Sequence, residues 1–266
     1  MTNIDHLLAI MARLRDPIAG CPWDREQTFN SLVPHTLEEA YEVADAIARG
    51  DTGELRGELG DLLFQVVFYA QIACEKGQFD FNDIVAAISD KLIRRHPHVF
   101  GDAQIASAAD QSSAWEEHKA AERAERAQEE NRPPSILDGV TNALPALTRA
   151  TKLQNRAARV GFDWPDIRQV MDKLEEETAE IEAEIAQGAP IERMEDEIGD
   201  LLFVAVNLAR HAGIDAETAA RRANAKFERR FRRIEALLAE SGRTPEQATL
   251  EEMDALWDRA KEEEKT

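Results

Sequence analysis

Residues 58–64 read ELGDLLF, and residues 197–203 repeat the pattern as EIGDLLF. In each copy the Glu and the Asp are three residues apart, so on a helix their side chains lie next to each other on one face. Apolar residues surround both acidic pairs, which predicts a buried helix that carries one narrow polar stripe. This helix, present once in each half of the chain, indicates an all-α fold of two tandem homologous helical modules.

The repeat extends beyond this helix, because further blocks recur in the same order. Helical periodicity also dominates the remaining chain, and no segment alternates with a period of two for long enough to predict a strand. The recurring blocks indicate that one helical unit was duplicated. They are 38–42 (EEAYE) with 176–180 (EETAE), 91–95 (KLIRR) with 226–230 (KFERR), and 115–119 (WEEHK) with 257–261 (WDRAK).

Residues 132–135 (RPPS) interrupt the helical pattern between the copies. Two adjacent prolines stop a helix and mark a boundary. We therefore predict an N-terminal module over 1–131, a linker over 132–135 and a C-terminal module over 136–266. Helices are expected near 3–15, 36–49, 54–76, 81–95, 110–130, 136–158, 166–187, 190–212, 215–240 and 249–262.

Composition limits the partners of the chain. The formal net charge of −20 argues against binding to a nucleic acid polymer, because the surface repels phosphate backbones. The longest apolar stretch, 62–73, is too short to span a bilayer, and residues 1–15 do not resemble a signal peptide. Cys21 and Cys74 form no metal-binding spacing. These features predict a cytoplasmic protein without a membrane partner.

The acidic pairs predict a metal cage in each module. A carboxylate cluster from two packed helices offers the oxygen ligands that Mg²⁺ prefers, with Mn²⁺ as a substitute. The alternative is a solvated acidic face, but a buried carboxylate without a partner is costly, which favours a metal. A di-iron bundle would need Glu-x-x-His motifs, which the chain lacks. The cage residues are Glu39, Glu42, Glu58 and Asp61 in the first module, and Glu177, Glu180, Glu197 and Asp200 in the second.

Basic residues on the helix predicted over 215–240 are candidates to bind phosphate. Lys226, Arg229 and Arg230 lie three or four residues apart, so they share one helix face. Arginine forks and a lysine point charge both suit phosphate oxygens. The alternative is a solvated basic face on an acidic protein. Trp257 either stacks on a base or ribose or anchors the last helix.

These motifs together resemble the MazG family of nucleoside triphosphate pyrophosphohydrolases, in its two-module bacterial form. The likeness covers nearly the whole chain, and the acidic signatures joined to their flanking stretches make it specific. The flanking stretches are 20–24 (GCPWD), 91–100 (KLIRRHPHVF) and 156–164 (RAARVGFDW).

The resemblance implies an all-α nucleoside triphosphate pyrophosphatase fold, with helices bundled across a homodimer. It implies hydrolysis between the α- and β-phosphates with broad base tolerance, serving nucleotide-pool housekeeping or stress regulation. Glu177, Glu180, Glu197 and Asp200 would hold Mg²⁺, and Glu176 would orient or deprotonate the attacking water. Catalysis is then assigned to Glu176, Lys226 and Arg230. The residues expected to contact nucleotide are Lys173, Glu176, Arg193, Asp200, Lys226, Arg229, Arg230 and Trp257.

The resemblance also implies that the C-terminal module is the main catalyst. The repeat supports this independently, because Lys173 corresponds to His35 and Arg193 corresponds to Glu54 in the first module. The first module keeps its acids, so a second active site stays open. Three alternatives remain: a regulatory module that binds nucleotide and metal with little turnover, a purely structural helical dimer, or an enzyme with a narrower nucleotide substrate.

Overall fold

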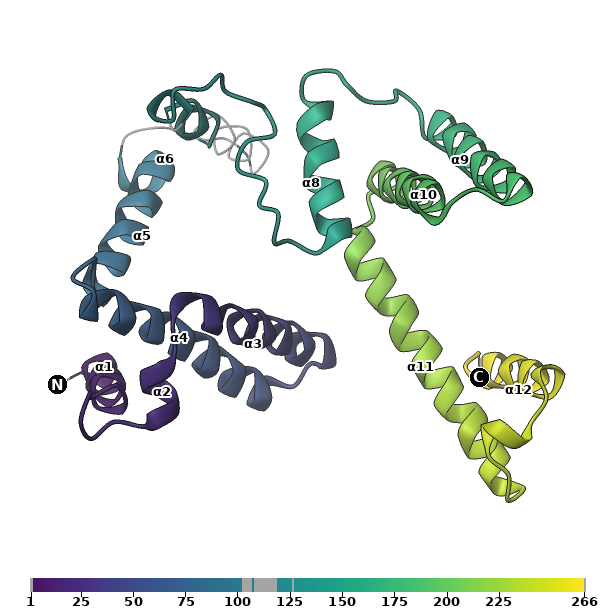
Figure 1. The fold of residues 1–266 in the computed structure, drawn as a ribbon, viewed down its shortest axis with the longest axis horizontal. Helices are drawn as coiled ribbons and strands as arrows, with labels where there is room; N and C mark the ends of the chain where they lie inside the picture. Colours follow the sequence, from purple (N-terminus) through teal and green to yellow (C-terminus); the bar gives the residue numbers. More distant parts are fainter. Residues whose placement is uncertain (1, 102–106, 108–118, 126, 266) are drawn as a thin grey trace. The chain divides into compact units, whose positions relative to one another are not determined.

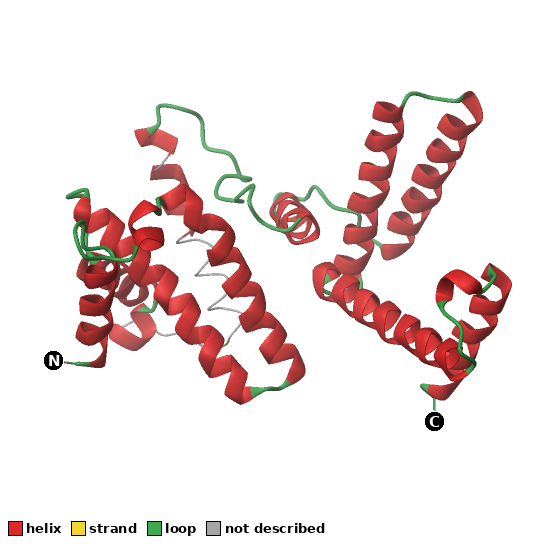
Figure 2. Cartoon of the chain, turned by 60° about the horizontal axis from the view of Figure 1, so that its bottom comes forward, coloured by secondary structure: helices red, strands yellow, loops and turns green. Residues whose placement is uncertain are grey.

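The computed structural model describes residues 2–101, 107, 119–125 and 127–265. Within these residues the ordered elements are helices and no strand occurs, which confirms the expected all-α fold (Figure 2). The chain divides into two compact units, Met1–His118 and Lys119–Thr266. The module boundary at 132–135, derived from the repeat and the prolines, stays a prediction.

The first unit is organised around a helical hairpin. Helices α3 (Phe29–Arg49) and α4 (Thr52–Glu75) run side by side in opposite directions (Figure 1). The turn forms because Gly50 adopts φ 70° at the end of α3, while the Asp51 side chain accepts hydrogen bonds from the first turn of α4. Residues 2–101 of this unit also form α1 (Asn3–Leu14), α2 (Pro22–Glu26), α5 (Phe81–Arg95) and α6 (Pro97–Phe100).

Helix α1 packs against α4 and completes the core of the first unit. The buried side chains in this core are Met11, Leu32, Val67, Phe68 and Ile72. Phe68 and Met11 are both fully buried, so the space between α1 and α4 is filled with apolar atoms.

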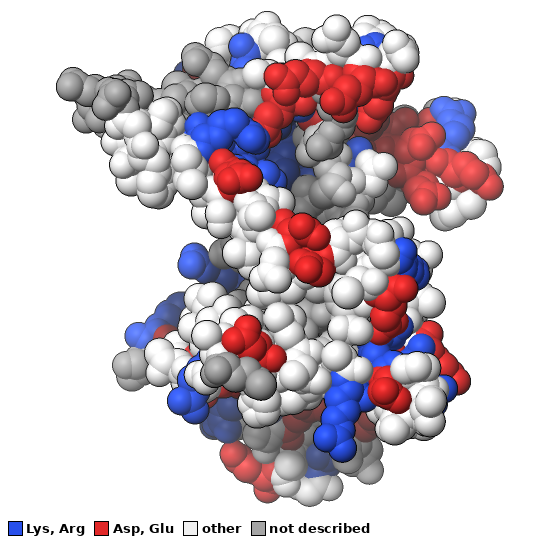
Figure 3. All heavy atoms as spheres, turned by 90° about the vertical axis from the view of Figure 1, so that its left-hand side faces the viewer, with Lys and Arg blue, Asp and Glu red and all other residues white. Residues whose placement is uncertain are grey.

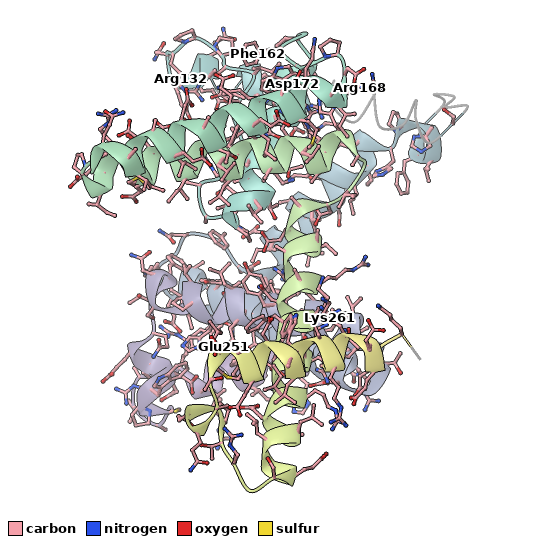
Figure 4. The ribbon with its side chains drawn as sticks, turned by 90° about the vertical axis from the view of Figure 1, so that its right-hand side faces the viewer. Arg132, Phe162, Arg168, Asp172, Glu251 and Lys261 are labelled. Atoms are coloured by element: carbon pink, nitrogen blue, oxygen red, sulfur yellow. The ribbon has the colours of Figure 1, made fainter. Side chains whose placement is uncertain are left out.

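The second unit repeats the hairpin with α9 (Ile167–Gln187) and α10 (Ile191–His211), joined at Gly188 with φ 62°. Helix α8 (Ala146–Ala158) packs against α10, as α1 packs against α4. Helix α11 (Ala216–Glu240) packs against α8 at one end and against α12 (Leu250–Glu263) at the other, with the short helix η1 (Pro245–Gln247) between α11 and α12. Figure 4 shows α12 lying across α11, with Glu251 near its beginning and Lys261 near its end.

Two of the predicted helix starts were wrong. Helix α3 begins at Phe29, not near residue 36, because Thr28 and Ser31 form a capping box ahead of it and Pro34 is accommodated inside the helix. Helix α8 begins at Ala146, not at 136, because Gly139 has φ 79° and Pro145 occupies the N-cap with the non-helical ψ of 141°. In the helix predicted over 110–130, residues 119–125 and 127–129 are helical, and 110–118, with most of the 115–119 repeat block, lie outside the described residues.

The surface agrees with the acidic composition. Asp and Glu side chains form contiguous patches on the face drawn in Figure 3, with Lys and Arg gathered in separate patches. No helix in the described parts of the chain combines the length and the apolar character needed to cross a bilayer.

The hairpin turn of the first unit leads to a testable prediction. A Cβ atom added at Gly50 or at Gly57 meets no atom within 4 Å, so the two positions differ only in backbone conformation. We expect Gly50→Ala to lower the free energy of unfolding by about 1 kcal/mol, because an L side chain is disfavoured at positive φ. Gly57→Ala, inside α4, is expected to raise it by about 0.5–1 kcal/mol. Urea unfolding followed by circular dichroism measures both, and the same sign for both variants would contradict the argument.

Candidate functional site

Carboxylates occupy buried positions at the α9–α10 interface. The buried residues of α9 are Val170, Glu177 and Glu184, which are 0%, 3% and 6% exposed. They are seven residues apart, so they share the helix face that packs against α10. Two of these three core positions therefore carry an acid, and a buried acid requires a partner.

Three of the predicted metal ligands lie together. Carboxylate oxygens of Glu177, Glu197 and Asp200 all lie within 4.8 Å of one another. Burial raises the pKa of Glu197, and the negative charges of Glu180 and Glu177 raise it further. Glu180 is exposed and lies outside the group of three, although its charge acts on Glu197. The geometry thus forms a concentrated negative site with Glu180 at its edge.

Lys173 compensates part of this charge. Its Nζ atom lies 2.8 Å from Oε1 of Glu176 and 2.8 Å from Oε1 of Glu177. These two hydrogen bonds raise the pKa of Lys173 above its ordinary value, so the ammonium stays charged. The second oxygen of Glu177, Oε2, is buried and has no hydrogen-bond partner. Glu176, the expected water-orienting group, has a side chain that is 58% exposed.

Glu184 is a site residue that the sequence interpretation missed. It forms an ion pair with Arg193 at the start of α10, and its Oε2 atom is buried without a hydrogen-bond partner. The signal was present in the sequence, because Glu184 follows Glu177 by seven residues. Arg193, expected to contact nucleotide, is therefore bound to a buried acid in this structure.

The basic residues of α11 lie next to α12. Arg229 and Arg230 each lie 2.7 Å from the Glu264 carboxylate, and Arg230 also lies over the Trp257 ring at 5.4 Å. Trp257 is 5.4 Å from the ring of Phe227, and Lys226 lies on the exposed middle part of α11. The structure brings Arg229, Arg230 and Trp257 together, and it pairs both arginines with Glu264 and not with the acids of α9 and α10.

The first unit contains a related acidic group. Carboxylate oxygens of Glu39, Glu42 and Glu58 lie within 4.8 Å of one another, and Asp61 lies outside this group. Burial raises the pKa of Glu39, and the charges of Asp61 and Glu42 raise it further, against a hydrogen bond from buried Gln65. The first module therefore keeps the acidic cluster.

The surroundings of the two clusters differ. His35 takes the place of Lys173 and lies 3.8 Å from Glu38. Across the hairpin, Arg49 of α3 binds Glu54 of α4 at 2.5 Å, whereas in the second unit the acid is on the first helix and the arginine on the second. Glu54 has the opposite charge to Arg193, its counterpart in the second unit, and Arg49 neutralises it within the first unit.

Comparison with known proteins identifies the family. The model of the MazG nucleotide pyrophosphohydrolase domain matches residues 27–100 and again residues 166–234. The chain belongs to the MazG family. The two matches contain the α3–α4 and α9–α10 hairpins, which confirms the tandem arrangement.

Relatives of this MazG chain bear names that describe the same kind of enzyme. It is 55% identical over 265 residues to the nucleoside triphosphate pyrophosphohydrolase of Escherichia coli K12, covering 99% of both chains. It is 41% identical to the nucleoside triphosphate pyrophosphohydrolase/pyrophosphatase MazG of Thermotoga maritima, covering 97% of this chain and 95% of the relative. A Mycobacterium tuberculosis nucleoside triphosphate pyrophosphohydrolase is 41% identical over 157 residues, covering 58% of this chain and 45% of the relative. The MazG chain is thus an enzyme of the pyrophosphohydrolase class.

The crowding of acids predicts how stability responds to substitution. We expect Glu197→Gln to raise the melting temperature in the presence of a chelator at neutral pH, because it removes one of several clustered negative charges. The pKa of Glu197 is higher in the folded protein than its ordinary value of 4.5. Ionisation of Glu197 therefore lowers the free energy of unfolding as the pH rises, and glutamine cannot ionise.

Thermal unfolding at pH 7 and at pH 3.5 tests this expectation. The stabilisation should be present at neutral pH and lost at the lower pH, where the raised pKa leaves the Glu197 carboxyl of the folded wild type protonated. Glu182→Gln, on the exposed surface of α9, serves as the control. A melting temperature of Glu197→Gln at or below that of the wild type at neutral pH would contradict the prediction.

Proposed function

We propose that the chain hydrolyses nucleoside triphosphates to nucleoside monophosphate and pyrophosphate, with broad base tolerance, at the acidic cluster of the second unit. The observation that carries the proposal is the group of Glu177, Glu197 and Asp200, whose oxygens lie within 4.8 Å of one another. Family membership and the names of the full-length relatives support the reaction. Such an activity would serve nucleotide-pool housekeeping or stress regulation in the cytoplasm.

Magnesium fits the second acidic cluster, and Mn²⁺ is a reasonable substitute. The donors are all carboxylate oxygens, which suit hard cations. The buried and unpartnered Oε2 atom of Glu177 is an acceptor that the protein itself does not satisfy. Glu177, Glu197 and Asp200 would hold the ion, with Glu180 at the edge. When bound, the cation would neutralise phosphate charge and lower the pKa of a coordinated water.

Glu176 and Lys173 would act on the attacking water and on the phosphates. Glu176 is exposed, adjoins the buried ligand Glu177, and accepts a hydrogen bond from Lys173. An exposed carboxylate in this position can orient a water molecule and accept its proton. Lys173 forms an ion pair with Glu177, and Arg193 forms one with Glu184. On binding, the triphosphate oxygens would compete with these carboxylates for the two cations.

The basic face of α11 is suited to the triphosphate and to the pyrophosphate leaving group. Arg229 and Arg230 already hold an anion, the Glu264 carboxylate, so phosphate oxygens would replace one anionic partner by another. Lys226 extends this face as a point charge. Trp257, which packs on Arg230 and Phe227, would flank the nucleotide.

A homodimer would complete the helical bundle. Although α1 packs against α4 and α8 packs against α10, both hairpins leave large apolar side chains uncovered, and burying such a face needs a further layer. A second copy offers matching apolar faces, which is how most homo-oligomers close. The exposed side chains on these hairpins include Leu37, Tyr41, Leu59, Leu63, Ile198, Leu202 and Phe203.

The first module is proposed to bind the same cation with little turnover. It retains Glu39, Glu42 and Glu58 but has His35 in place of Lys173. The first module thus lacks the ammonium group that lies beside Glu177 in the second, so phosphate charge would be less well balanced there. The first module would then be a regulatory module that binds metal with little turnover, while the second module is the enzyme.

The first experiment is product analysis with a panel of ribo- and deoxyribonucleoside triphosphates, with Mg²⁺ or with EDTA. We expect monophosphate and pyrophosphate, lost with EDTA. Glu177→Gln and Asp200→Asn should each reduce kcat by at least about 100-fold, because each removes a charged ligand. Their helical circular dichroism should be unchanged. Release of diphosphate and phosphate would place the attack at the γ-phosphorus and overturn the proposal, and so would full activity of both variants.

The two modules can be separated by a matched substitution. Glu39→Gln in the first unit should change kcat less than about threefold, because the second cluster supplies the chemistry. The comparison with Glu177→Gln uses the same chemical change at the equivalent helix position. An equal loss of activity in both variants would show that the first module shares catalysis.

The dimer is tested by sedimentation velocity. Wild-type protein should sediment as a dimer, and Leu202→Glu should shift it to monomer because a charge then interrupts the apolar face of α10. Leu250→Glu, at an exposed position at the start of α12, should leave the dimer intact. A monomeric wild type would refute the assembly.

A further inference from the structure

A buried ion pair lies next to the second acidic cluster. Helices α9 and α10 lie side by side and are joined by the short turn at Gly188 (Figure 1). The buried Glu184 carboxylate pairs with Nη2 of Arg193, whose side chain is 58% exposed. Each partner is four residues, or about 6 Å, nearer the turn than the cluster residue on its own helix, which is Glu180 on α9 and Glu197 on α10. The pair therefore adjoins the proposed metal site, and burial and the charges of nearby acids, Glu184 among them, raise the pKa of Glu197.

The first unit lacks both members of this pair. The repeat places Ala46 of α3 at the position of Glu184, and Glu54 of α4 at the position of Arg193. Ala46 is fully buried, so an apolar residue is accepted at this position of the hairpin interface. The buried acid thus occurs in the module that has the arginine and is absent from the module that does not.

Packing alone does not account for Glu184. Its Oε2 atom is buried and has no hydrogen-bond partner, so the ion pair leaves part of the carboxylate unsatisfied. A buried ion pair is often no more stable than apolar side chains of similar volume. The hairpin would therefore lose little stability if Glu184 were apolar, which points to a role for the acid beyond the fold.

The pair leaves much of Arg193 available to a ligand. A guanidinium group carries five N–H donors in a planar fork. Arg193 donates to Glu184 through Nη2, and its Nε and Nη1 atoms have no hydrogen-bond partner among the residues that the structure describes. A triphosphate would therefore compete with Glu184 only for Nη2. A side chain that is already held in place also loses less conformational entropy when it binds an anion.

We propose that Glu184 is a positioning residue, which holds Arg193 at the edge of the acidic cluster so that its guanidinium meets a phosphate of the bound nucleotide. The inference rests on the proposed function, in which the cluster binds a cation and the triphosphate. The cation and Arg193 would then bind different oxygens of one triphosphate. Glu184 is buried, so it acts through Arg193 and does not touch the nucleotide itself.

The test compares Glu184→Met with Glu75→Met. Methionine adapts to buried positions and has no carboxylate. Glu75 pairs with Arg15 in the first unit, so its replacement removes an ion pair outside the second unit. Glu184→Met should raise KM for ATP and the inhibition constant of inorganic tripolyphosphate about fivefold each, and should change kcat less than twofold. Its melting temperature should not fall, because a buried acid is removed and the released arginine is exposed. Glu75→Met should change neither constant.

The role of Arg193 is tested by combining substitutions. In an Arg193→Gln background, Glu184→Met should change KM less than twofold, because a positioning residue acts only through the residue that it holds. Glu184→Gln keeps an oxygen that accepts a hydrogen bond from Arg193, so its KM should lie between those of the wild type and Glu184→Met. If Glu184→Met does not fold, a rise in KM of Glu184→Gln that requires Arg193 supports the proposal.

Three results would overturn the positioning role while the reaction stands. They are an unchanged KM in the Glu184 variants, a rise in KM that is equally large without Arg193, and a fall in KM, which would mean that Glu184 competes with the phosphates. If the wild type releases no pyrophosphate, the proposed reaction fails, and the calorimetric Kd of ATP with Mg²⁺ replaces KM. A Kd that rises in Glu184→Met only when Arg193 is present supports the positioning role; an unchanged Kd, or no binding of ATP by the wild type, overturns it.

Discussion

Two buried carboxylates on α9 determine which charged groups the second unit must bring to the interface between α9 and α10. A helix hairpin is ordinarily held by apolar side chains at its interface, but α9 turns Glu177 and Glu184 toward α10 together with Val170. Lys173 and Arg193 neutralise these acids in part, and each acid keeps one buried oxygen without a hydrogen bond. The protein therefore retains unsatisfied negative charge at an interface where apolar packing would be more stable. Functional sites commonly sacrifice stability in this way.

The duplicated module solves the same packing problem in two ways. In the first unit, Met11 and Phe68 close the space between α1 and α4 with a continuous apolar core. In the second, Gln154 and Asn207 line an open pocket between α8 and α10, and the small core there contains Ala150, Val206 and Ala216. The interior of the first unit is thus filled with apolar side chains that stabilise it, whereas the second unit has buried polar groups and an open pocket at the same place.

The distribution of charge also distinguishes the site from the rest of the surface. The chain has a formal net charge of −20, yet arginines concentrate on α11. Their partners there are Glu263, the last residue of α12, and Glu264, the residue after it. A local basic face of this kind can bind a small anion although the whole molecule is acidic, because nearby charges dominate at short range. The acidity that argues against a nucleic acid polymer is therefore compatible with a nucleotide.

The sequence by itself determined the helical class, the duplication and the acids that gather in each hairpin. These features are local: Glu197 and Asp200 share a face because of helical periodicity, and the repeat of EIGDLLF is visible in the chain. The predicted starts of α3 and α8 were wrong, because the capping box at Thr28 and the positive φ of Gly139 override the apolar pattern. Only the tertiary structure decided that Glu184 pairs with Arg193, that Glu180 lies outside the group of three, and that Gln154 bonds to Phe203 and faces a pocket. Those contacts join different helices, and hydrophobic periodicity specifies which face of a helix is buried without specifying which residues of another helix will meet it.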